Sequence, residues 1–235
     1  MTGNQGKTSK KPPASSGTTT TAAPRRTQQE RTAQAEQALL DAAAALFARR
    51  GVDRTSLADV GLEAGYSRGL VNHHFGSKAA LIDRLAHDIQ ARFVAGIVTK
   101  MTESGDDAVQ TLVGLVQDYL SALVSEPDAG RAFFVMWSSA IPDEATLRSI
   151  FAADDALFRL GVETVVRAGQ AEATVDSALD PAATAVTLVG MLRGVGAQYL
   201  IAPDAVALTA AIEAGQRFVR QSLSPTTQRK PSRAK

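Results

Sequence analysis

The sequence contains no cysteine among its 235 residues, and only 5% of its residues are aromatic. Without cysteine the chain forms no disulfide, thiolate metal site or thiol nucleophile, and this composition fits a reducing compartment. Only three histidines are present. The adjacent His73 and His74 point to different faces of a helix, so they do not make a metal-binding pair. We therefore expect no metal site, no cofactor and no catalytic residue.

Several enzyme motifs are also missing. The sequence has no G-x-x-x-x-G-K phosphate loop and no G-x-S-x-G nucleophile elbow. Paired acids such as Asp106-Asp107 and Asp154-Asp155 diverge on a helix, where solvated faces explain them better than catalysis does. No apolar run is long enough to span a membrane, and the N-terminus lacks the apolar core of a secretory signal. We therefore predict a cytoplasmic protein that is not an enzyme and does not enter a membrane.

Positive charge is concentrated at the two ends of the chain. Residues 1–29 contain no leucine, isoleucine, valine or aromatic residue, so we predict a disordered basic tail there and a second one over 223–235. Residues 1–35 carry a net charge of +5, whereas the body over residues 36–220 carries −8. A basic arm can add contacts to the phosphates of a nucleic acid. A tail that only improves solubility explains the same charges equally well.

A short helix is predicted after residue 56. Ser56 and Asp59 have the spacing of a capping box, and Gly65 stands where the helix should end in a left-handed residue. Gly61 in the middle of this helix costs about 1 kcal/mol relative to alanine. A close approach of another helix would explain that glycine.

A second short helix is predicted over residues 68–75, capped by Ser67. Its outward face carries Arg68 and Asn72, and these residue types pair with guanine and adenine edges. Lys78 then opens the next helix, where a cation opposes the helix dipole unless an anion such as a DNA phosphate binds there. Two short helices joined by a glycine turn predict a helix-turn-helix DNA reader. An ordinary three-helix packing unit is the alternative.

The same stretch carries the residues Gly51-Val52, Thr55-Ser56, Ala64-Gly65-Tyr66-Ser67, Gly69, His74-Phe75 and Ser77-Lys78. Over residues 35–85 they resemble the N-terminal signature of TetR-type transcriptional regulators. The resemblance implies an all-helical homodimer whose three N-terminal helices bind operator DNA and whose larger C-terminal domain binds a small effector. Most members are repressors that a ligand releases. The predicted DNA contacts are Thr55, Ser56, Ser67, Arg68, Gly69, Asn72, His73 and Lys78.

The sequence departs from the family pattern at two places. Val60-Gly61 replaces the common Ile-Ala of the first motif helix, and Asn72-His73 replaces the common Tyr-Tyr of the recognition helix. A tyrosine that would contact phosphate is therefore missing, and the reading surface differs from the family pattern at Asn72 and His73.

The predicted fold class is all-α, with an N-terminal three-helix helix-turn-helix DNA-binding domain joined by a long helix to a C-terminal helical effector-binding and dimerisation domain. Apolar residues at helical spacing and Pro, Gly and Asp at the breaks support this organisation. The predicted domains are residues 30–77 and 78–222. Further helices are predicted near 30–50, from 78 onward, and near 106–124, 128–139, 143–169, 181–201 and 204–222.

Aromatic residues between 119 and 158 suggest an effector pocket, because aromatic-lined concavities between helices are common ligand sites. An apolar stripe is more often plain core. The acidic body favours either a cationic effector or simply a solvated surface. The predicted pocket residues are Tyr119, Phe133, Phe134, Met136, Trp137 and Phe158.

The two last predicted helices resemble the family's four-helix dimer interface. Small residues at Gly190, Gly194 and Gly196 allow close helix approach. A twofold dimer places two recognition helices about 34–36 Å apart, one turn of DNA. Completion of a monomeric core is the alternative. The predicted interface residues are Leu188, Met191, Leu192, Val195, Tyr199, Ile212 and Phe218.

The resulting hypothesis is a regulator that binds palindromic operator DNA as a homodimer at the nucleoid and is released by an unknown small-molecule effector. An activator of the same fold is one alternative. A sequence-independent architectural DNA binder would need basic residues over the folded body, which is acidic. The alternative from another class is a ligand-binding or enzymatic helical protein that does not read DNA.

Overall fold

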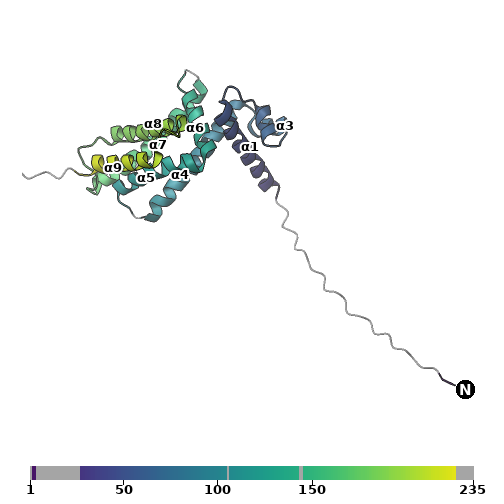
Figure 1. Cartoon of the computed structure of the whole chain (residues 1–235), viewed down its shortest axis with the longest axis horizontal. Coiled ribbons are helices and arrows are strands. Elements are labelled where there is room, and N and C mark those ends of the chain that lie inside the picture. Colours follow the sequence, from purple (N-terminus) through teal and green to yellow (C-terminus); the bar gives the residue numbers. More distant parts are fainter. Residues whose placement is uncertain (1, 4–26, 105, 143–144, 226–235) are drawn as a thin grey trace, which may run out of the picture.

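The computed structural model describes residues 2–3, 27–104, 106–142 and 145–225. Within these residues the chain forms nine α-helices and no β-strand, which confirms the all-α prediction. Most of the predicted tails, 1–29 and 223–235, lies outside the described residues. Figure 1 shows a small head, which contains α1 to α3, beside a larger helical body.

The head consists of α1 (Gln28–Arg50), α2 (Leu57–Glu63) and α3 (Arg68–Phe75). Thr27 and Glu30 form a capping box, so α1 begins two residues earlier than predicted. The core of the head contains Phe47, Val60 and Val71, one from each helix, and all three are fully buried. Each helix therefore places one apolar face against the other two.

The long helix α4 (Lys78–Ser104) runs from the head into the body, as predicted. It packs against α1 and α3 of the head and against α5, α6 and α7 of the body. The body also meets the head through α6 (Pro127–Ser139), which packs along α1. The head is therefore coupled to the body by two helices, and the sequence predicted only α4.

The body is built around α5 (Ala108–Ser125), which contacts α7 (Ala145–Ala171), α8 (Pro181–Ile201) and α9 (Leu208–Leu223). Asp107 and Asp180 cap α5 and α8 by accepting hydrogen bonds from Gln110 and Ala183, which explains why these helices begin where they do.

The predicted start of the last helix at residue 204 is wrong. Pro203 and Asp204 lie in a turn, and α9 begins at Leu208. The N-cap position is Ala207, which provides no side-chain cap. The proline and aspartate resembled a helix start in sequence, but they close the turn that reverses the chain after α8.

Helix α8 is long and apolar enough, by length and composition alone, to cross a membrane. This differs from the expectation that no apolar run reaches that length. One face of α8 packs against α5, α7 and α9 of the body. Its buried residues include Ala185, Leu188 and Leu192. Part of its apolar character is therefore explained by the core of the body.

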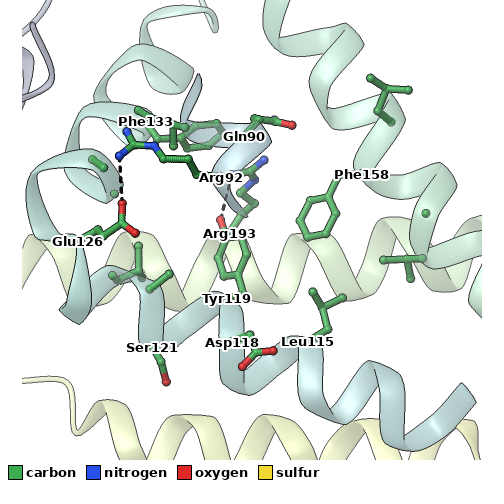
Figure 2. A pocket seen from close by; sticks show the side chains of 18 of the residues that line it. Gln90, Arg92, Leu115, Asp118, Tyr119, Ser121, Glu126, Phe133, Phe158 and Arg193 are labelled. Carbon is green, nitrogen blue, oxygen red and sulfur yellow. Dashed lines mark hydrogen bonds and ion pairs between the residues drawn. The ribbon is translucent and has the colours of Figure 1, made fainter. Parts of the chain in front are cut away.

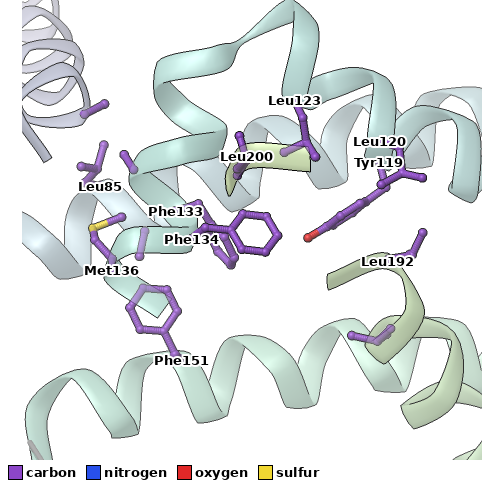
Figure 3. Close-up of a cluster of buried hydrophobic side chains, with 14 of the residues drawn as sticks. Leu85, Tyr119, Leu120, Leu123, Phe133, Phe134, Met136, Phe151, Leu192 and Leu200 are labelled. Atoms are coloured by element: carbon purple, nitrogen blue, oxygen red, sulfur yellow. The ribbon is translucent and has the colours of Figure 1, made fainter. Parts of the chain in front are cut away.

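The body core is aromatic where α5, α6 and α7 meet. Phe133 packs edge-to-face on Phe151, with ring centroids 5.6 Å apart. Figure 3 shows Met136 beside Leu85 of α4, whereas Phe134 and Tyr119 lie on the other side of α6. Helix α6 therefore has one face against the head and α4, and another against the interior of the body.

Candidate functional site

Helix α3 exposes the face that the sequence predicted. Val71 and Phe75 are buried against the head, whereas Arg68, Asn72 and His73 are exposed. Within the described residues, no hydrogen bond or ion pair holds the Arg68 guanidinium. Its donors are available to an external partner, and guanidinium forks match guanine edges and phosphates.

The packing of α3 on α2 requires glycine at two positions, Gly61 within α2 and Gly65 in the turn between the two helices. A Cβ at Gly61 would lie 3.0 Å from Cγ2 of Val71 and 3.1 Å from the carbonyl oxygen of Tyr66. Gly65 has a φ of 75°, a left-handed conformation that favours glycine. The close approach predicted at Gly61 is thus confirmed, and it fixes how α3 stands on α2.

Ser56 and Ser67 are N-caps, as predicted. The Ser56 hydroxyl accepts a hydrogen bond from the Asp59 amide and donates to the Asp59 carboxylate at 2.6 Å. The hydroxyl of Ser56 and, to a smaller extent, its backbone N–H both donate to the Asp59 carboxylate and lower the pKa of Asp59. The Ser67 hydroxyl accepts a hydrogen bond from the Leu70 amide at 3.3 Å.

A concave surface of about 460 Å³ lies where the starts of α2, α3 and α4 meet. It brings Ser56, Arg68 and Lys78 together, although they are up to 22 positions apart. The Lys78 ammonium lies 3.5 Å from the carbonyl oxygen of Asp53. The lining carries three cations, Arg54, Arg68 and Lys78, against two acids, Asp53 and Asp59. This excess of positive charge beside helix starts favours an anion such as a phosphate.

Thr55 lies in the same concavity but does not present its hydroxyl there. Its side chain is buried, and its hydroxyl donates to the carbonyl oxygen of Gly51 at 3.0 Å. The Thr55 hydroxyl is therefore not available to DNA, and the predicted DNA contact of Thr55 would have to come from its backbone. Thr55 instead holds the turn that leads from α1 into α2.

A second cavity, of about 960 Å³, lies in the body between α4, α5, α6, α7 and α8 (Figure 2). Its apolar lining includes Leu115 and Phe133, and its mouth carries the exposed Leu157 and Leu160. A cavity of this size with a mostly apolar lining and few polar groups is typical of a small-molecule site.

Four of the six predicted pocket residues line this cavity: Tyr119, Phe133, Phe134 and Phe158. The other two do not. Met136 is fully buried and lies beside Leu85 of α4, outside the cavity lining. Trp137 is half-buried, and its indole nitrogen donates to Asp155 at 3.0 Å. Helical spacing explains the error, because residues three and four apart lie on one side of a helix but that side can meet more than one neighbouring helix.

The most informative cavity residue was not predicted. Arg193 of α8 is only 7% exposed and lines the cavity. One of its terminal nitrogens donates to Asp155 at 2.9 Å and the other to the Tyr119 hydroxyl at 2.9 Å. Its Nε is buried and has no hydrogen-bond partner within the described residues. A single arginine in the middle of an apolar helix was the available sequence signal.

Four aromatic rings surround the Arg193 guanidinium. Its central carbon lies 4.3 Å from the ring centre of Phe133 and 5.7 to 5.8 Å from those of Tyr119, Trp137 and Phe158. Such rings attract a cation through their negative faces. Burial raises the pKa of Tyr119, and the nearby guanidinium offsets part of that effect.

The predicted dimer residues divide into two groups. Leu188, Leu192 and Ile212 are buried in the core of their own chain, so they are not free to meet a second copy. Met191, Val195 and Tyr199 are half-buried, and Phe218 is 52% exposed. The exposed face of α8 instead carries Val186, Gly190, Gly194 and Ile201.

The fold and these two sites define a two-part helical regulator, with an exposed reading head and a ligand-sized cavity in the body. Two family comparisons agree with this class. Residues 39–85 match the family described as bacterial regulatory proteins, tetR family. Residues 108–224 match the family described as BetI-type transcriptional repressor, C-terminal. The chain belongs to the tetR family, and it has a BetI-type C-terminal domain.

The sequence identity between this chain and individual relatives is low. The chain is 25% identical over 111 residues to the transcriptional regulator BetI of Vibrio parahaemolyticus, a match that covers 47% of this chain and 56% of BetI. It is 27% identical over 183 residues to the transcriptional regulator TtgR of Pseudomonas putida, which covers 74% of this chain and 84% of TtgR. The chain thus matches about half the length of that BetI.

A solved structure shares the fold. The transcriptional regulator from Saccharomonospora viridis in complex with choline superposes with a TM-score of 0.71 at 20% sequence identity. The superposition covers 82% of this chain and 98% of the regulator's chain. This similarity concerns the fold alone. Membership in a family of transcriptional regulators confirms the prediction that the chain is a regulator and not an enzyme.

Proposed function

We propose that this protein is a homodimeric transcriptional repressor that binds palindromic operator DNA through α3 and is released when a small molecule enters the cavity of the body. The observation that carries the proposal is the exposed face of α3, whose Arg68 has no partner within the described residues. The protein acts in the cytoplasm, at the nucleoid.

On DNA, α3 lies in the major groove with Arg68 and Asn72 toward the base edges. The concavity at Ser56 and Lys78 then receives a phosphate of the flanking backbone, which fixes the position of α3 along the groove. His73 stands where the family commonly has a tyrosine. Its ring nitrogen can bond to a base edge or to a phosphate.

A second copy of the chain covers the exposed faces of α8 and α9. A Cβ added at Gly190 or Gly194 would meet no atom within 4 Å, so a second helix has room to approach these glycines closely. Val186, Ile201 and Phe218 add exposed apolar area beside them. This contact also explains the apolar face of α8 that the protomer's own core leaves uncovered.

The dimer is tested by Gly194→Arg. A bulky cation on this face separates the copies, and sedimentation measures the change from dimer to monomer. Gly114→Arg on α5 is the matched control, because a Cβ at Gly114 also meets nothing. A Gly194→Arg protein that remains dimeric places the interface elsewhere.

Helix α6 supports coupling between cavity and head. Phe133 and Phe134 face the cavity, and the same helix packs along α1 of the head. A ligand that moves α6 therefore changes the position of α3 relative to its twofold copy, and spacing between recognition helices controls operator affinity. The repressor assignment is supported by the description of the matching C-terminal family.

Selection of bound genomic fragments by the purified protein tests the whole proposal. The recovered fragments should share an inverted repeat whose half-sites are about one helical turn apart. An Arg68→Ala protein should recover no such repeat. Fragments without a shared sequence would indicate an architectural DNA binder, and transcription that rises when the protein is bound would indicate an activator.

A further inference from the structure

We propose that the cavity of the body binds an amphiphilic molecule with an apolar chain and an anionic, carboxylate-type head, and that Arg193 holds this head. The inference rests on the proposed function because it names the class of effector for the same cavity. It also excludes quaternary ammonium compounds as the preferred ligands.

The aromatic box in the cavity already contains a cation. Quaternary ammonium ligands bind where aromatic faces surround an empty space. Here the faces of Phe133, Tyr119 and Phe158 surround the guanidinium of Arg193, and the Phe133 ring centre lies 4.3 Å from it. A ligand cation would have to displace Arg193 or lie beside a like charge, and both are unfavourable.

Arg193 has donors left for a further acceptor. A guanidinium has five N–H donors. Asp155 and Tyr119 accept one each, which leaves three. One of these three is the Nε donor, which has no partner within the described residues although Arg193 is only 7% exposed. A buried donor without a partner is costly. The Nε atom is itself covered, so the guanidinium has to shift for an oxygen of a ligand head to reach it and remove that cost. A carboxylate oxygen forms the stronger, charge-assisted bond with any of the remaining donors.

The rest of the cavity suits an apolar chain. Leu115, Phe134 and Val165 line it, and Leu157 and Leu160 stand at its mouth with 66% and 57% of their surface exposed. Covering these leucines with an apolar chain removes hydrophobic surface from water.

The acidic groups of the cavity do not offer a better place for a cation. Glu126 is paired with Arg92 at 3.6 Å near the rim, as Figure 2 shows. Asp155, which lies behind Arg193 and is not part of the lining, accepts from both Arg193 and Trp137. Asp118 lies at the wall of the cavity, and it too has a partner in the structure. Among the residues that line the cavity, the Nε donor of Arg193 is thus the buried side-chain group that still lacks a partner within the described residues.

Three compounds that share one alkyl chain and differ in their head group show whether the cavity prefers an anionic, a neutral or a cationic head. Decanoate, 1-decanol and decyltrimethylammonium are titrated, below micelle-forming concentrations, into the full-length protein without DNA. Binding is measured by calorimetry and by the fluorescence of Trp137, the only tryptophan, whose indole donates to the carboxylate that holds Arg193. We expect decanoate to bind tightest and decyltrimethylammonium weakest.

The variant Arg193→Gln should weaken decanoate binding roughly ten- to hundredfold, the loss of one charge-assisted hydrogen bond. It should leave 1-decanol within a few-fold of the native protein. Arg167→Gln is the matched control, because it removes one guanidinium charge from α7 where Arg167 pairs with Glu163, outside the cavity lining. Circular dichroism checks that both variants are folded.

A second variant keeps the test decisive if Arg193→Gln does not fold. Asp155→Asn retains the shape and an oxygen acceptor but removes the carboxylate that neutralises Arg193. We expect decanoate to bind about threefold tighter or more to this variant, because less of the guanidinium charge is compensated.

Three results overturn the inference: tighter binding of decyltrimethylammonium than of decanoate, equal binding of decanoate and 1-decanol, or no saturable binding of any of the three. Because DNA is absent, these results leave operator binding untouched. Conversely, a protein that prefers decanoate but selects no genomic repeat would refute the proposed regulator function and leave the head-group assignment standing.

Discussion

Arg68 in the head and Arg193 in the body are the same residue type in opposite settings. Arg68 is exposed on α3 and has no partner within the described residues. Arg193 is buried on α8, holds Asp155 and Tyr119, and lies against four aromatic rings. The difference shows that a surface arginine is available for recognition at little cost to folding, whereas a buried arginine is part of the packing and can recognise a ligand only with the donors that its packing partners leave unused.

The largest expected effect is on the free energy of unfolding, which should depend strongly on Arg193 and hardly at all on Arg68. Arg193→Met should lower the free energy of unfolding by about 3–5 kcal/mol, because Asp155 loses the partner of a largely buried ion pair. Arg68→Met should change it by less than about 0.5 kcal/mol, as for most surface sites. Urea denaturation at one fixed protein concentration measures both. Equal losses would remove the distinction between the regions.

DNA binding should show the reverse order. Arg68→Ala should weaken binding to the selected operator by about 1–3 kcal/mol and relax the preference at one base position. Fluorescence anisotropy with the operator and with single-base variants of it measures affinity and selectivity together. An unchanged affinity and selectivity would show that the outward face of α3 is assigned wrongly.

Lys78 should contribute affinity without selectivity. Lys78→Ala should weaken binding to all DNA sequences alike and reduce the salt slope of the binding constant by about 1, the loss of one phosphate contact. Titrations at several salt concentrations, with operator and with random DNA, give the slope. A loss confined to the operator would instead place Lys78 against a base.

The smallest effect concerns Asp154, the acidic neighbour of the Arg193 pair. Burial raises the pKa of Asp154 in the folded protein, and its Oδ2 has no partner within the described residues. His87 and Asp83 face it from α4, and Asp155 and Arg193 from its other sides.

A raised pKa means that the folded state prefers the protonated acid. The charged form therefore costs stability above the folded pKa, and that cost vanishes below the unfolded value of about 3.9. Asp154→Asn should stabilise the protein at neutral pH and lose this advantage as the pH falls through that range. Thermal unfolding of both proteins across pH tests the sign, and a destabilised variant at neutral pH would contradict it.

The head was largely predictable because its signals are local. Ser56, Gly65 and Ser67 act within one turn of their own backbone, so their spacing alone predicts where α2 and α3 begin and end. Thr55 shows the limit of this reasoning. Thr55 was predicted to contact DNA because it is polar and precedes α2. Only the folded structure shows that its hydroxyl donates to the carbonyl oxygen of Gly51.

The body was predicted less completely because its site joins distant segments. Helical spacing placed the aromatic residues of α6 in one cluster, but it did not reveal that Phe133 faces the cavity while Met136 faces α4. Leu188 and Leu192 matched an apolar interface, yet the protomer buries them itself and leaves Gly190 and Gly194 outward.

The sequence by itself determined the family, the all-α class and the bounds of α2 and α3, because capping residues, glycine turns and apolar spacing act over a few residues. Only the tertiary structure decided which residues meet across 74 positions, as Arg193 and Tyr119 do. It placed a buried cation inside an aromatic box, because the packing of α5, α6, α7 and α8 closes around that guanidinium. That packing, and not any local pattern, sets the chemistry of the cavity.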